Sequence, residues 1–168
     1  MMRPMAEERD LGALAREIID SNLFMTLATA DAEGRPWATP VYFTPHEYRE
    51  FFWMSEPGSR HSRNVAARPE VAIAIFNSQV LPGGARAVYV EAEAIELTDE
   101  SDYERGVEIY NSRFPDPEKY NLRRFASEEM WPPAPFRLYR ATATAHYVLD
   151  PAGHPDGSAG DHRAPVEI

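Results

Sequence analysis

The chain has 168 residues, the length of a single domain, with 43% hydrophobic and 26% charged residues as in an ordinary globular protein. Its formal net charge of −10 argues against binding to nucleic acid or to anionic membranes. The absence of cysteine excludes disulfides, thiolate nucleophiles and zinc–cysteine sites. There is no apolar signal core at the start and no apolar run long enough to cross a membrane, so we expect a cytoplasmic protein.

The first part of the chain predicts a helix followed by two strands. Apolar residues recur at helical spacing over Glu7–Asp20, which predicts an amphipathic helix. Strands are expected at Leu23–Ala30 and Pro36–Thr44, separated by a turn at Asp31–Gly34. Pro40 cannot donate to a sheet ladder, so we expect an edge or a bulge there with free backbone groups. Such an edge can serve a ligand or can simply face solvent.

The remaining elements follow the same patterns. Val71–Phe76 is apolar on both faces and is therefore expected at the centre of a sheet, buried on both sides. Arg86–Thr98 alternates apolar and polar residues, which indicates one buried face. Asp99 has the position of an N-cap for the helix that follows. The other expected elements are a strand at Glu50–Ser55, a helix at Glu100–Phe114, a connection at Pro115–Ala126 with one further helical turn, and a last strand at Phe136–Leu149.

Six strands in a mostly meander order, with short helices at the connections, predict a mainly β fold with peripheral helices (α+β). Such a set closes into a small antiparallel barrel more readily than it stacks as a sandwich. We expect one domain over residues 1–150. Residues 151–168 form a tail rich in Gly, Pro and Asp, a composition typical of partly disordered segments. The histidines and aspartates of this tail do not have the spacing of a metal site, and we expect none.

The segment Gly58–Pro69 carries the strongest functional signal. Ser59 has the N-cap position of a short helix, and this helix should end at Arg68 because the residue before a proline avoids helical geometry. The unpaired amides and the dipole at a helix start attract anions. The segment has no acidic residue, and its basic side chains are Arg60, His61, Arg63 and Arg68. We interpret it as a phosphate-binding site, the alternative being a solvated basic helix face.

No other motif supports a reaction by itself. The sequence has no Walker loop, no dinucleotide-binding fingerprint and no serine nucleophile elbow, so no catalytic residue can be named. The phosphate site, the broken edge at Pro40 and the aromatic residues near both suit a flat aromatic cofactor with a phosphate tail.

Several stretches together resemble the pyridoxamine 5′-phosphate oxidase-like flavin-binding split barrels in their order and spacing. They are Phe24–Thr29, Gly34–Phe43, Phe52–Ser55, Gly58–Asn64 and Pro69–Ala72. The resemblance implies a six-stranded antiparallel split β-barrel over residues 1–150 and a homodimer with FMN at the subunit interface. Carried over to this chain, the backbone around Thr39 and Val41 would face the flavin ring, and Met54 and Ser55 would lie along the cofactor. The phosphate would be held by Ser59, Arg60 and His61, with Arg60 best placed for bidentate binding, while Asn64 would be structural.

The chain also departs from the name-giving oxidase. That enzyme has a basic residue where Ala38 stands, lysines where Phe43 and His61 stand, and a glutamine near Ala87. These differences argue against oxidation of pyridoxamine phosphate. We therefore expect an FMN-binding oxidoreductase acting on an unidentified small molecule. The alternatives are a deazaflavin-dependent reductase of the same fold and a non-catalytic flavin-binding or carrier protein.

Overall fold

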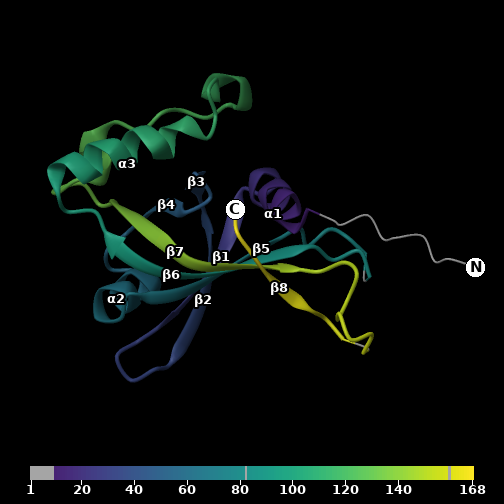
Figure 1. Ribbon diagram of the computed structural model, residues 1–168. Helices are drawn as coiled ribbons and strands as arrows, with labels where there is room; N and C mark the ends of the chain where they lie inside the picture. Colours follow the sequence, from purple (N-terminus) through teal and green to yellow (C-terminus); the bar gives the residue numbers. More distant parts are fainter. Residues whose placement is uncertain (1–9, 82, 159) are drawn as a thin grey trace, which may run out of the picture.

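The computed structural model describes residues 10–81, 83–158 and 160–168, which form a curved antiparallel sheet with peripheral helices (Figure 1). The sheet has eight strands in the order β2-β1-β5-β6-β7-β4-β3, with β8 pairing to β7. The strands are β1 (Phe24–Ala30), β2 (Pro36–Tyr42), β3 (Thr44–His46), β4 (Glu50–Ser55), β5 (Glu70–Phe76), β6 (Ala87–Glu96), β7 (Arg137–Leu149) and β8 (Arg163–Val166). The helices are α1 (Leu11–Ser21), α2 (Arg60–Ala67) and α3 (Glu100–Ser112), with 3-10 turns at Pro117–Tyr120 and Ser127–Met130. The expected mainly β split barrel is confirmed.

The strand count was wrong in two places. The segment expected as one strand at Pro36–Thr44 divides at Phe43, because β2 pairs with β1 while β3 pairs with β4. Phe43 is fully buried between them, where the chain crosses from one end of the sheet to the other. The tail also contributes β8, which pairs with β7 through His146 and Val166. A four-residue strand that contains a proline has too little periodicity to be detected in the sequence.

Strand β5 lies between β1 and β6, as expected for a central strand, but it is buried on one face only. Val71, Ile73 and Ile75 point into the core, whereas Ala72 is exposed and Phe76 is 48% exposed. The apolar outer face of β5 therefore lies open in the single chain.

The core is divided between the two faces of the sheet, because Phe51 and Trp53 of β4 belong to one buried cluster and their alternating neighbours Phe52 and Met54 to another. Residues 7–9 of the expected first helix lie outside the described residues, and α1 begins after the N-cap Asp10. The predicted N-cap Asp99 is confirmed, since its carboxylate accepts from the amides of Ser101 and Asp102, both at 3.1 Å. No helix in the described residues is both long and apolar enough to span a bilayer. The two buried clusters are centred on Leu27, Phe51, Trp53 and Ile73 beneath α1, and on Phe52, Tyr103, Val107 and Leu138 beneath α3.

Strand β2 is an edge of the sheet, as Pro40 predicted. The Phe43 amide donates to the Leu23 carbonyl at 3.2 Å. This bond shows which residues of β2 direct their backbone groups toward β1. In an antiparallel pair, every second residue directs its backbone N–H and C=O to the partner strand. Counting back from Phe43, Pro36 and Pro40 are among the residues whose backbone groups point away from β1. The two prolines therefore cost no ladder hydrogen bond. Strand β2 lies against β4 without a ladder among the described residues, and this gap is the split of the barrel.

Candidate functional site

Helix α2 begins where the sequence places it, directly after β4 and a tight turn. The Ser59 hydroxyl accepts from the Ser62 amide at 3.3 Å, which makes Ser59 the N-cap. The helix ends at Arg68, whose amide donates to the Asn64 carbonyl at 2.8 Å. Its first turn contains no acidic residue. The start of α2 is therefore not neutralised by a carboxylate of its own.

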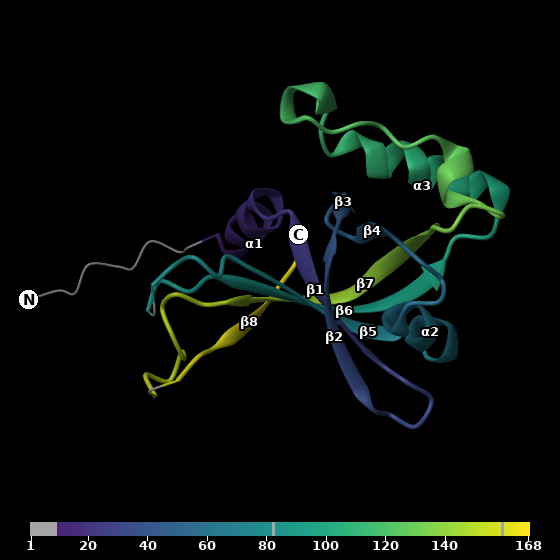
Figure 2. The ribbon, with the colours of Figure 1, turned by 180° about the vertical axis from the view of Figure 1, so that it is seen from behind.

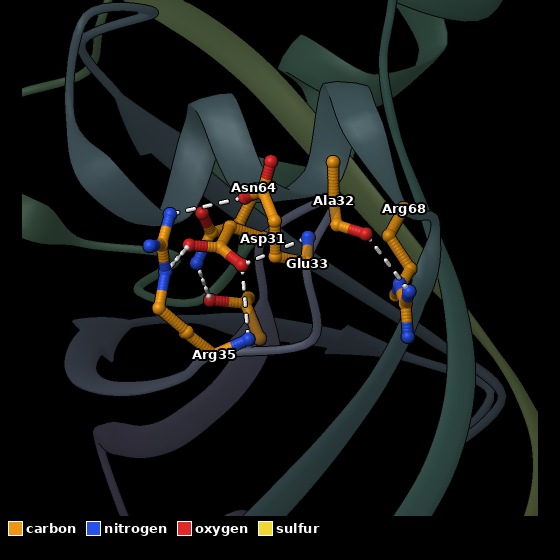
Figure 3. Close-up of polar contacts among 7 residues, drawn as sticks. Asp31, Ala32, Glu33, Arg35, Asn64 and Arg68 are labelled. Carbon is orange, nitrogen blue, oxygen red and sulfur yellow. Dashed lines mark hydrogen bonds and ion pairs between the residues drawn. The ribbon is translucent and has the colours of Figure 1, made fainter.

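The helix is fixed to the β1–β2 hairpin, and the views from both sides show it beside that hairpin (Figures 1 and 2). The buried Asn64 amide group donates to the Thr29 hydroxyl at 2.9 Å, and the Arg68 guanidinium reaches the Ala32 carbonyl at 3.4 Å (Figure 3). Arg35 closes the hairpin turn by an ion pair of 2.7 Å with Asp31. Asn64 is thus a structural residue, as expected, and Arg68 is engaged by the backbone.

Three predicted residues meet at the start of α2. The ring of His61 lies with its Nε2 atom 2.7 Å from the Ser55 hydroxyl and 3.2 Å from the Ser59 hydroxyl. His61 is 8% exposed, and this burial lowers its pKa from the ordinary value of 6.5. The ring is therefore neutral at pH 7. It can donate or accept a hydrogen bond there, but it does not add the positive charge that the sequence suggested.

The arginines of this region differ in what they contact. Arg63 donates to the Gly58 carbonyl, so its guanidinium folds back on the turn. Arg60 has neither a hydrogen bond nor an ion pair with the described residues, and its guanidinium carbon lies 4.4 Å from the centre of the Trp37 ring. Trp37 is on β2 and is 41% exposed. Sequence reasoning did not select Trp37, although it stands two residues before Thr39 in a stretch that resembles the family.

The other predicted residues lie on β2 and β4. Thr39 is half-buried on β2, and its hydroxyl oxygen is buried with no partner among the described residues. Val41 belongs to the barrel core. Met54 packs in the cluster beneath α3, on the face of β4 opposite to Ser55, because successive strand residues alternate. The structure thus brings Ser55, Ser59 and His61 together, with Arg60 beside them.

This arrangement can bind a phosphate monoester. The first-turn amides of Arg60 and His61 lie at a helix start, where intrahelical acceptors are lacking. The uncompensated guanidinium of Arg60 adds a planar set of donors that matches phosphate geometry. The Thr39 hydroxyl, two residues beyond Trp37 on the same strand, is a further polar group without a partner among the described residues, and its oxygen is buried in the single chain.

Comparisons with known proteins agree with this fold. A family model described as pyridoxamine 5′-phosphate oxidase matches residues 11–150. A pyridoxine/pyridoxamine 5′-phosphate oxidase from Rubrobacter xylanophilus is 31% identical over 96 residues, which is 55% of this chain but 42% of that enzyme. This chain therefore aligns with less than half of the length of that curated relative.

Two solved structures share the fold. HutZ, a heme storage protein from Vibrio cholerae, has a TM-score of 0.61 and 20% identity, over 79% of this chain and 90% of its own. A FAD-binding protein from Mesorhizobium loti has a TM-score of 0.58 and 20% identity, over 79% of this chain and 88% of its own. Since the family model spans most of the described chain, from α1 to the end of β7, this protein belongs to the pyridoxamine 5′-phosphate oxidase family.

Proposed function

We propose that this protein is an FMN-binding flavoprotein and an oxidoreductase acting on a small molecule. The observation that carries the proposal is Arg60, a guanidinium without a hydrogen-bond partner among the described residues, placed at a helix start that lacks acidic side chains. The FAD-binding relative of the same fold supports a flavin. The residues proposed to hold the cofactor are Thr39, Val41, Met54, Ser55, Ser59, Arg60 and His61, with Val41 and Met54 contributing backbone groups only, because their side chains pack in the core.

The charge of the protein makes this local arrangement informative. A chain with a net charge of −10 repels anions at long range, so an anion must be held by specific local donors. Phosphate carries charge that the helix dipole and one guanidinium can partly neutralise. The neutral His61 can complete the set by donating a hydrogen bond rather than charge, and the Ser59 hydroxyl can do so by turning its proton away from the Ser62 hydroxyl, to which it donates at 2.9 Å.

When bound, a flavin supplies the ring that accepts or donates electrons, so the protein needs no acid, base or nucleophile of its own for that step. The contribution of this chain is to bind, orient and exclude water. Arg60 and Ser59 would fix the phosphate end. The Thr39 hydroxyl would take a hydrogen bond that its own fold does not provide, and the buried Val41 would keep the β2 side of the site dry.

We further propose that a second copy of the chain covers the open face of the sheet and completes the site, as the resemblance implies. On this face Phe24 is 60% exposed and Phe76 is 48% exposed. A hollow of about 430 Å³ lies beside them on this face and is lined by residues that include Thr26, Ala74 and Tyr89. Apolar surface of this kind is characteristic of an interface.

The interface can be tested with Ala74→Arg, which places a charge in this hollow. Sedimentation velocity should show a dimer for the wild type and a monomer for the variant, and the monomer should have lost FMN affinity. A wild-type monomer that binds FMN would refute the dimeric site.

The test of the function itself is titration of the purified full chain with FMN, riboflavin, a deazaflavin and hemin, followed by fluorescence quenching or visible absorption. We expect FMN to bind more tightly than riboflavin, because only FMN has the phosphate. Preference for the deazaflavin or for hemin, with no FMN binding, would overturn the proposal. If FMN binds but no reduced nicotinamide and no oxygen supports turnover, the protein is a flavin carrier and the oxidoreductase assignment fails.

A further inference from the structure

We propose that Trp37 is a positioning residue that holds the guanidinium of Arg60 in place for the cofactor phosphate. This inference rests on the proposed function and deepens it. It assigns a role to an exposed tryptophan on an edge strand, a position where a large aromatic side chain otherwise loses contact with the core.

The contact joins two elements that do not pair with each other. Trp37 comes from β2 and Arg60 from the first turn of α2, and the guanidinium carbon stands 4.4 Å from the ring centre. At this distance a guanidinium is attracted to the face of an indole ring. Arg60 forms no hydrogen bond with the described residues, so the contact with Trp37 leaves its N–H groups available, and these groups are the ones that bind phosphate.

A chain of hydrogen bonds fixes the two partners relative to each other. Asn64 follows Arg60 by four residues, so both side chains lie on the same face of α2. The Asn64 amide donates to the Thr29 hydroxyl at 2.9 Å, and this hydroxyl in turn donates to the Trp37 carbonyl at 3.4 Å. The backbone of Trp37 is thereby tied to the helix that carries Arg60.

The physical benefit is preorganisation. An exposed arginine samples many rotamers and loses that freedom when it binds a ligand. Arg63 and Arg68 are held by backbone carbonyls instead, which occupies some of their donors. Stacking on Trp37 orders Arg60 without occupying its donors, so the side chain is already restricted before phosphate arrives.

The test compares FMN with riboflavin in four variants: Trp37→Ala, Trp37→Phe, Arg60→Ala and the double variant Trp37→Ala/Arg60→Ala. Trp37→Ala should weaken FMN binding about two- to five-fold, the scale of an exposed cation–π contact. Riboflavin affinity should not change, and Trp37→Phe should retain most of the FMN affinity. In the Arg60→Ala background, Trp37→Ala should have no further effect, because Trp37 acts through Arg60.

The matched control is Tyr120→Ala, which removes an aromatic side chain that is 57% exposed on a 3-10 turn outside this site. It should leave both affinities unchanged, and circular dichroism should show that every variant is folded. Equal losses for FMN and riboflavin would mean that Trp37 contacts the ring system, and an additive double variant would mean that it acts without Arg60. Either outcome, or an unchanged FMN affinity in Trp37→Ala, overturns the positioning role. Failure of the wild type to bind FMN would instead overturn the proposed function.

Discussion

Replacing Arg60 by alanine tests the phosphate site most directly. The guanidinium forms no hydrogen bond with the described residues, so the substitution removes donors without leaving a protein acceptor unpaired. Charge-assisted hydrogen bonds contribute about 1.5–3 kcal/mol, so FMN affinity should fall roughly 10- to 150-fold. The free energy of unfolding should change by at most about 1 kcal/mol, because the stacking of Arg60 on Trp37 lies at the protein surface.

Fluorescence titration with FMN measures this loss, and Arg63→Ala is the matched control. Arg63 lies one helical turn from the N-cap and has the same charge, but it donates to the Gly58 carbonyl. If long-range charge alone attracted the cofactor, the two variants would lose similar affinity. We expect Arg63→Ala to retain FMN affinity within about two-fold, which is the scale of a screened surface charge. Equal losses in the two variants, or wild-type affinity in Arg60→Ala, would refute the assignment of Arg60.

Three further predictions concern the fold. Gly106→Ala places a Cβ atom 2.6 Å from Leu97 and 2.9 Å from Leu138, two buried side chains beneath α3; urea denaturation should show a loss of about 1–3 kcal/mol despite the better helix propensity of alanine. Asp99→Ala removes the N-cap of α3 and should cost about 1 kcal/mol in the same measurement. Because the pKa of His61 is lowered in the folded state, the unfolded chain takes up that proton first as pH falls below 6.5. Protonation of His61 therefore leaves the free energy of unfolding unchanged above this pH and lowers it below this pH. In His61→Gln, the free energy of unfolding should fall less steeply between pH 7 and about pH 5.5.

The elements that were predicted correctly depend on local chemistry. Ser59 and Asp99 were identified as N-caps because a serine or aspartate ahead of a helical segment acts through its own next residues. The buried face of β6 was evident because its small apolar residues alternate with polar ones. Pro40 located the edge because proline lacks an amide donor.

The features that sequence reasoning missed depend on contacts through space. The charge of His61 follows from its burial beside Ser55 and Ser59, and residue identity does not report burial. Arg60 and Arg63 are equivalent in sequence, yet one stacks on Trp37 and the other donates to a backbone carbonyl. The one-sided burial of β5 was missed because its outer residues are as apolar as its inner ones. The pattern of apolar residues in a strand does not show whether its second face is buried within the same chain or is covered by another molecule.

The two prolines of β2 have a consequence for self-association. An exposed strand edge normally invites another chain to add a strand, which is a route to aggregation. At Pro36 and Pro40 the outward positions of β2 carry no amide donor, so an incoming strand would meet a broken row of partners. The edge of β2 therefore disfavours the addition of a strand from another chain. The split between β2 and β4 remains accessible to a ligand smaller than a polypeptide.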